Sequence, residues 1–385
     1  MVSITRVSLS PFDLGSAANQ VAYHCESFGF TRGDATWNTR LAGDSFEVYE
    51  ANPNHRILIF RDGFGLNVRR MIREIEFSDT KQIARVLIDR GQYHRDIRSG
   101  IHPDATYMSE LRNAASSEAH NKALRPRLWS WPPYTFSFFY IDAQPSEVSN
   151  SSLHNCHLAA LLEPSQVLNS ELLDDEADRE TFCTTLISRL PGEDILGRAG
   201  NCDIRSGSVL YASWASLVMI DPHNDSLGYL EALEIRLQSA WMRAHYVRSF
   251  AESLIENDQM RLDPLVEFTT KALPLLRRSQ RLLGGSVSTR DQRIFDKLSE
   301  TSELTREIHA AEEAVEDVKT NIVAISSKRN RWFDSSIQAL LVMLAVFQMY
   351  PILFKTPVLH LPTYAAYGPL VAGIIIVFAL FWFRR

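Results

Sequence analysis

The sequence predicts a mixed α/β (α+β) N-terminal domain in the cytosol, followed by long stalk helices and a C-terminal transmembrane hairpin of two helices. Three observations support this prediction. Segments rich in β-branched and aromatic residues alternate with helical segments up to residue 225. Heptad spacing of apolar residues dominates after it. Residues 335–354 and 364–383 form two uncharged, strongly apolar segments of twenty residues each, the length that crosses a bilayer.

The overall composition is that of a globular chain. Of its 385 residues, 45% are hydrophobic and 22% are charged, so most of the chain should fold as a compact body. The net charge of −6 argues against nucleic acid as a partner, which would favour a basic excess. The N-terminal segment lacks the pattern of a signal peptide. Four widely spaced cysteines match no disulfide scaffold, and we expect reduced thiols.

We predict that residues 1–225 form the cytosolic α/β domain. Strands are expected at 44–51, 55–62 and 134–143, and a single buried strand at 207–221. Helices are expected at 80–91 and 105–124, and the acidic segment 163–190 also has a helical pattern.

Residues 226–334 should form a helical, coiled-coil stalk. Apolar residues recur three and four positions apart from Leu230 to Leu254, and again from Leu304 to Ile325. Such a seam requires a partner helix along its length. Between Arg290 and Phe354 nothing before Pro351 breaks a helix, so one continuous helix of about 98 Å is expected over this segment from a rise of ~1.5 Å per residue. The alternative is a short coiled coil, a loop near residues 326–330 and a separate span.

Residues 335–385 should form the transmembrane hairpin, with a short turn between its spans. Lys328, Arg329 and Arg331 precede the first span, and Arg384 with Arg385 follows the second. Because an excess of lysine and arginine marks the cytoplasmic side, we expect an integral membrane protein with both termini in the cytoplasm. Pro351 should end or kink the first span.

Motifs for catalysis are weak, and we expect no enzyme. The segment "HNCH" (154–157) has side chains that bind metals, but no second ligand pair follows at a suitable spacing, which favours a structural role. The glycines of "GEDILGRAG" (192–200) lack the Lys-Ser/Thr of a phosphate loop. Arginines at 277, 278, 281, 290 and 293 form either an anion site or, more commonly, a solvated helix end. The sequence identifies no resident metal site.

The expected architecture resembles the CorA family of divalent-cation channels. The antiparallel helices, a long stalk and two C-terminal spans carry this resemblance over residues 207–385. It implies a homo-oligomer, a pentamer in that family, whose first span lines the pore. It also implies Mg²⁺ or another divalent cation as the transported ion, and no other cofactor. Lys328, Arg329 and Arg331 match the basic residues at that family's membrane edge.

The family's Gly-Met-Asn signature is absent from this chain. The corresponding place reads Phe347-Gln348-Met349-Tyr350, so only the aromatic residue and the methionine match. The family's asparagine offers amide carbonyls to a hydrated cation, whereas tyrosine offers one hydroxyl and more bulk. The resemblance therefore supports the architecture better than it supports selectivity for magnesium.

The 4-3 spacing, continued past Ile325, predicts which residues face a pore. Met343 and Val346 would form a hydrophobic constriction. Tyr350 would be the selectivity element with Gln348 beside it, or alternatively an interfacial aromatic residue that faces lipid. The predicted pore and selectivity residues are Ser336, Ala339, Met343, Val346, Gln348 and Tyr350.

Three functions follow from these patterns. The first is a CorA-like oligomeric channel or transporter for metal cations, with a cytosolic regulatory domain. The second is a membrane-anchored sensor or defence effector, whose cytosolic domain binds a signal and gates a CorA-like hairpin. The third is an enzyme that uses the hairpin only as an anchor.

Overall fold

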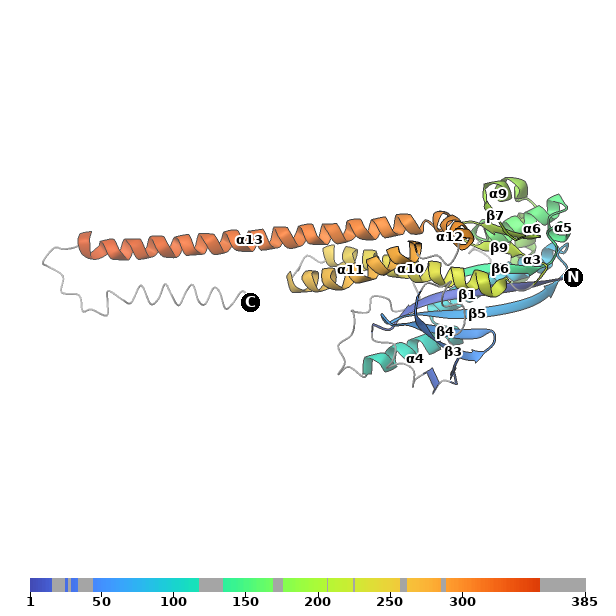
Figure 1. Cartoon of the computed structure of the whole chain (residues 1–385), viewed down its shortest axis with the longest axis horizontal. Helices are drawn as coiled ribbons and strands as arrows, with labels where there is room; N and C mark the ends of the chain where they lie inside the picture. Colours follow the sequence, from blue (N-terminus) through green and yellow to red (C-terminus); the bar gives the residue numbers. More distant parts are fainter. Residues whose placement is uncertain are drawn as a thin grey trace. The chain divides into compact units, whose positions relative to one another are not determined.

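The computed structural model describes most of the chain up to residue 353 (Figure 1). The described ranges are 1–15, 25–26, 29–33, 44–117, 134–168, 176–205, 207–223, 226–256, 262–284 and 289–353. The chain divides into two compact units. Unit 1 comprises Met1–Gln259 and Glu267–Glu316, and unit 2 comprises Met260–Val266 and Asp317–Arg385.

The centre of unit 1 is a sheet in which nine described strands lie in the order β2-β3-β4-β5-β1-β6-β9-β8-β7. Strands β6 and β9 pair in parallel, and the other described pairs are antiparallel. The bounds are β1 Val2–Asp13, β2 Thr31–Arg32, β3 Phe46–Asn52, β4 His55–Phe60, β5 Phe64–Ile75, β6 Phe136–Asp142, β7 Gly200–Arg205, β8 Ser208–Ala212 and β9 Leu217–Ile220.

Two long strands, β1 and β5, form the middle of this sheet and run side by side (Figure 1). Leu9 lies opposite Val68 on β5, and Val7 lies opposite Phe138 on β6. Residues 4–15, which comprise most of β1 and the two residues after it, are buried. Strand β1 pairs with a strand on each side and is covered on both faces of the sheet. Nearly all of its residues are therefore buried.

Helices cover both faces of the sheet. The side chains of β5 (Phe64–Ile75) show this, because they contact different helices on the two faces. Phe64 and Arg70 contact α10 (Leu227–Ile255), through Tyr246 and Glu231 respectively. Asn67 instead donates to Tyr93 of α3 (Thr80–Ser99). Because side chains alternate between faces along a strand, α10 and α3 lie on opposite sides of the sheet.

The remaining helices of the α/β region complete the layer around α3. They are α4 Pro103–Ser117, α5 Pro145–Val148, α6 Ser152–Leu162, α7 Ser165–Leu168, α8 Glu176–Ile187 and α9 Gly192–Arg198. The helix α3 begins at Asp79, whose carboxylate accepts from the Lys81 N–H at 2.9 Å, and ends at Gly100 with a φ of 75°. A carboxylate N-cap and a left-handed glycine C-cap set both ends.

Most expected elements of the α/β region are confirmed, and one is wrong. The strands expected at 44–51, 55–62 and 134–143 correspond to β3, β4 and β6. The segment 207–221 holds two antiparallel strands, β8 and β9, and not one, because a turn at Ser213–Ser216 reverses the chain. The long strands β1 and β5 were not expected.

Four helices follow the sheet in the described part of the chain: α10, α11 Leu262–Gly284, α12 Thr289–Thr301 and α13 Leu304–Leu353. The expected continuous helix from Arg290 is interrupted once, at Ser302 and Glu303, where Glu303 has a φ of 56°. The alternative with a loop near residues 326–330 is wrong, because α13 is helical throughout that segment. The helix also continues two residues past Pro351.

Both heptad seams are buried within the chain where they lie in unit 1. On α10, the seam residues from Leu230 to Ala251 are buried, and on α13 Leu304, Ile308 and Val315 are buried as well. His245 and Arg248 of α10 contact Glu307 of α13. The partner of the first part of each seam is therefore a helix of the same chain.

The predicted transmembrane hairpin is not found. Within the described part of the chain, no helix is both long enough and apolar enough to cross a membrane. This finding corrects the fold class, the transmembrane helices and the localisation expected from the sequence. The second expected span, 364–383, lies outside the described residues.

Replacing Gly192 with alanine should lower the free energy of unfolding of unit 1 by about 1–3 kcal/mol. An added Cβ would lie 2.5 Å from the backbone carbon of Asn155, and a helix backbone cannot yield as a side chain does. Gly197 on the same helix α9 is the control, because its Cβ would meet nothing within 4 Å. Alanine there should stabilise by roughly 0.5–1 kcal/mol. Urea unfolding of both variants checks this pair, and equal losses would contradict it.

Candidate functional site

The predicted pore residues do not form a site within the described single chain. Lys328, Arg329 and Arg331 are exposed on α13. Ser336 is half-buried and donates to the Trp332 carbonyl at 2.8 Å, and Ala339 is exposed. Nothing is described of the side chains of Met343, Val346, Gln348 and Tyr350. Their pore role stays a prediction.

The "HNCH" segment has a structural role, on helix α6. His157 is fully buried, with Nδ1 2.7 Å from the Phe77 carbonyl and Nε2 3.0 Å from Thr80 Oγ1. Both ring nitrogens are thus engaged with the segment that leads into α3. Among the described residues, no three histidine, cysteine or acidic side chains gather where they could hold a metal ion.

One arginine of the expected anion cluster is engaged in an ion-pair network. Arg278 on α11 pairs with Asp44, which also pairs with the buried Arg243 of α10 at 2.7 Å. Arg243 Nε contacts Asp62 at 2.5 Å. This part of the cluster stabilises the packing of α10 and α11 on the sheet.

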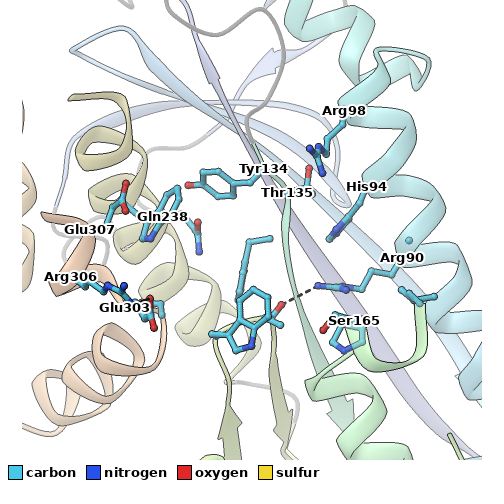
Figure 2. A pocket seen from close by; sticks show the side chains of 18 of the residues that line it. Arg90, His94, Arg98, Tyr134, Thr135, Ser165, Gln238, Glu303, Arg306 and Glu307 are labelled. Atoms are coloured by element: carbon cyan, nitrogen blue, oxygen red, sulfur yellow. Dashed lines mark hydrogen bonds and ion pairs between the residues drawn. The ribbon is translucent and has the colours of Figure 1, made fainter. Parts of the chain in front are cut away.

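A pocket of unit 1 lies between α3, α7, α10, the β8–β9 turn and the start of α13 (Figure 2). We call it the α3–α10 pocket. Its volume is about 1080 Å³, at the upper end of the ~300–1,000 Å³ typical of ligand pockets. Side chains from α3 and from α10 with α13 point into it from opposite sides (Figure 2).

The α3 side of the pocket is basic. Arg90, His94 and Arg98 are spaced four residues apart, so they lie on one face of the helix. Arg90 is only 8% exposed and donates from Nη2 to the Ala215 carbonyl at 3.1 Å. Burial lowers its pKa to about 9, so it stays charged at neutral pH. Its Nε is buried and has no hydrogen-bond partner among the described residues.

His94 contributes a neutral ring to this side. Its Nε2 lies 2.7 Å from Ser137 Oγ on β6. Burial, together with the charges of Arg90, Arg6 and Arg98, holds the pKa of His94 well below its usual range. Positive charge on this side therefore comes from the arginines.

On the opposite side of the pocket, the carboxylates are already engaged. Glu307 pairs with Arg248 at 2.7 Å and with His245 at 3.1 Å, and Glu303 pairs with Arg306 at 3.2 Å. Four arginines and two glutamates line the pocket in total, so positive charge is in excess. Such a pocket favours an anionic ligand.

Aromatic side chains lie between the two sides. Tyr134 packs edge-on against Trp241 with ring centroids 4.7 Å apart, and Trp241 stacks on His245 at 4.8 Å. The Tyr134 hydroxyl is buried and has no described partner. Burial, aided by Glu234 and Glu307, raises the pKa of Tyr134 well above its usual range, so it is a hydrogen-bond donor.

Replacing Glu234 with glutamine should remove a pH dependence of stability. Glu234 is fully buried on α10 and accepts from the pocket residue Gln238 at 3.3 Å. Burial raises its pKa to about 8, above that of the unfolded chain. The folded state then binds this proton more tightly, so stability is greatest in acid and falls as pH rises from about 4.3 towards 8.

The loss should be a few kcal/mol, since each pKa unit corresponds to about 1.4 kcal/mol. Urea unfolding at several pH values should show the difference between wild type and Glu234→Gln widening up to about pH 8. Glu231→Gln is the contrast, because Glu231 is paired with Arg70 and Arg56. That variant should be less stable than wild type. A constant gap between Glu234→Gln and wild type would contradict the assignment.

Sequence reasoning missed the α3–α10 pocket. The helix expected at 80–91 stopped before His94 and Arg98, so the basic face was not visible. The spacing Arg-x₃-His-x₃-Arg was available as a signal once the helix was extended to Gly100. Trp214 and Glu303, by contrast, reach the pocket only through the tertiary fold.

Comparisons with family models, curated proteins and solved structures found no match. The resemblance to the CorA family therefore stays a prediction. Ion transport depended on the transmembrane hairpin, and we do not carry it forward.

Proposed function

We propose that the α/β unit binds a small anionic molecule in the α3–α10 pocket, and that its occupancy controls self-association of the chain through α13. The protein would act as a ligand-responsive binding protein and not as an enzyme. One observation carries the proposal: Glu303, Arg306 and Ala310, at the start of α13, form part of the pocket wall. A bound ligand would therefore touch the helix that continues into unit 2.

Binding suits the pocket better than catalysis does. A general acid or base must reach a substrate proton with a pKa near the working pH. Here His94 is neutral and engaged by Ser137, and Glu307 is engaged by Arg248. Among the described pocket residues, the buried donors without a hydrogen-bond partner are Arg90 Nε, Arg248 Nε and the Tyr134 hydroxyl. Donors of this kind hold an acceptor in place.

The junction between α12 and α13 is where ligand binding in the α3–α10 pocket would change the conformation of the chain. Glu303 there has a φ of 56°, a conformation that costs about 1–3 kcal/mol for a residue other than glycine. A change of conformation at this junction would release that strain. A ligand that binds one conformation more tightly shifts the population towards it.

Self-association is expected from the part of α13 that lies in unit 2. Five of the seven described large apolar side chains that are exposed there fall within about 80° of the helix circumference, and Trp332 and Val342 lie outside this arc. The five are Val323, Phe333, Ile337, Leu341 and Leu344. A stripe of this kind favours packing against another helix. We propose the same helix of other copies as the partner. Five copies, as the CorA resemblance implies, stay a prediction.

Filling the pocket should test the coupling without knowledge of the ligand. Ala310 is half-buried at the pocket wall, so Ala310→Trp should occupy part of the space that a ligand would fill. Glu313→Trp is the control, because Glu313 is exposed on the same helix and does not line the pocket. Native mass spectrometry and hydrogen exchange over residues 302–316 are the measurements.

We expect Ala310→Trp to slow exchange at the α12–α13 junction and to shift the ratio of oligomer to monomer. A shift of about fivefold corresponds to roughly 1 kcal/mol, a small part of what a bound ligand supplies. Glu313→Trp should change neither quantity. Wild-type exchange and wild-type mass distribution in Ala310→Trp would refute the coupling.

A further inference from the structure

Trp214 is exposed, yet the turn that carries it is firmly held. Its side chain is 67% exposed at the edge of the α3–α10 pocket, between β8 and β9. Three side chains donate hydrogen bonds to backbone carbonyls around this turn: Ser213 Oγ to Leu162 (2.8 Å), Ser216 Oγ to Ser137 (2.9 Å) and Arg90 Nη2 to Ala215 (3.1 Å). A large apolar ring presented to solvent on a fixed turn is suited to stack on a planar partner.

Arg90 connects this turn to the basic side of the pocket. Its guanidinium is more than nine-tenths buried and points into the pocket, with Nη2 holding the Trp214 turn (Figure 2). Its buried Nε has no described partner. A buried donor without a partner carries an energetic penalty that an anionic ligand would remove. The anion and the planar ring would then lie next to each other.

Arg98 extends the basic side along α3. It lies eight residues after Arg90, which separates the two by about 12 Å along the helix axis. One carboxylate or one phosphate could contact only one of them directly. A chain of two or three phosphates could approach both, and the arginine fork matches phosphate oxygens.

From this arrangement we infer that the ligand of the α3–α10 pocket is a nucleoside di- or triphosphate. Trp214 stacks on its base, and Arg90 and Arg98 bind its phosphates. The inference rests on the proposed function, because it names the ligand class of the same pocket. The pocket volume of about 1080 Å³ leaves room for base, sugar and phosphates together.

Titration calorimetry on the full chain, with four probes, tests the ligand class. The probes are adenosine diphosphate, guanosine diphosphate, adenosine and inorganic pyrophosphate. At least one diphosphate nucleotide should bind. Adenosine should bind at least about tenfold more weakly than adenosine diphosphate, because it lacks the groups that contact the arginines. Pyrophosphate should also bind more weakly, because it cannot stack.

Single substitutions test separately the residue proposed to bind phosphate and the residue proposed to stack on the base. Arg98→Gln and Trp214→Ala change exposed side chains, so both should fold. Arg98→Gln should weaken nucleotide and pyrophosphate binding alike. Trp214→Ala should weaken nucleotide binding roughly tenfold and leave pyrophosphate unchanged. Arg95→Gln is the matched control, since Arg95 is exposed on α3 and does not line the pocket.

Three results would overturn the inference. They are no binding of either nucleotide, equal binding of adenosine and adenosine diphosphate, or nucleotide binding that neither Arg98→Gln nor Trp214→Ala weakens. The proposed function fails separately. If nucleotides do not bind but Ala310→Trp still shifts self-association, the ligand class is wrong and the coupling stands. If nucleotides bind but Ala310→Trp has no effect, the site stands and the coupling is wrong.

Discussion

Replacing Arg243 with methionine should lower the free energy of unfolding of unit 1 by about 3–5 kcal/mol. The Arg243 side chain is fully buried on α10. It contacts Asp44 at 2.7 Å and Asp62 at 2.5 Å, and its Nη1 donates to the Ser239 carbonyl at 2.8 Å. The guanidinium also lies 5.0 Å from the centre of the Phe60 ring. Methionine would fill much of the space. It would, however, remove the positive charge that Arg243 places beside the carboxylates of Asp44 and Asp62.

The physical reason is the uncompensated charge, and a second variant isolates it. Asp62→Asn in the Arg243→Met background should recover part of the lost stability, because it removes one of the two carboxylates that have lost the Arg243 charge. Arg281→Met is the control for removal of an arginine. Arg281 is exposed on α11, so its loss should change stability by no more than about 0.5 kcal/mol. Urea unfolding measures all four proteins.

A loss for Arg243→Met no larger than that for Arg281→Met would show that the network adds no stability. A double variant less stable than Arg243→Met would show that lost packing, and not the unpaired carboxylate, causes the effect.

Local pattern predicted much of the α/β region. The strands β3, β4 and β6 are rich in β-branched and aromatic residues, and such composition is visible without any tertiary context. Strand β1 was missed although its sequence "VSITRVSLSPFD" alternates apolar residues with Ser, Thr and Arg, a pattern that indicates a half-buried strand. Its polar members, among them Ser8 and Ser10, are buried by neighbouring strands and helices. Only the assembled sheet shows this.

The heptad pattern predicted helices correctly but not their partners. A seam requires a partner without saying whether the partner belongs to the same chain. The part of α13 around Ile308 is buried within unit 1, whereas several apolar side chains after Val318, such as Val323 and Leu341, are exposed. Hydropathy likewise predicted membrane spans that the described residues do not contain. The α3–α10 pocket combines six segments of the chain, so no single segment could reveal it.

Placing glutamate at both Ile337 and Leu341 should abolish self-association of the full chain. Both side chains are exposed in the single chain, at 43% and 58%, so the fold of one copy loses little from the change. In a bundle of α13 helices, they would lie in the shared interface with Phe333 and Leu344. Carboxylates brought together there would have to be desolvated close to one another, which costs several kcal/mol per ion.

Gln338→Glu supplies the matched control for added charge. Gln338 is also exposed on α13, but it lies about 100° around the helix from Ile337, outside the apolar stripe. Sedimentation and native mass spectrometry should show oligomers for wild type and Gln338→Glu, and a single copy for Ile337→Glu/Leu341→Glu. If that variant keeps the wild-type mass, the helix stripe is not the contact. A monomeric wild-type chain would contradict self-association itself, and the α3–α10 pocket would then act within one copy.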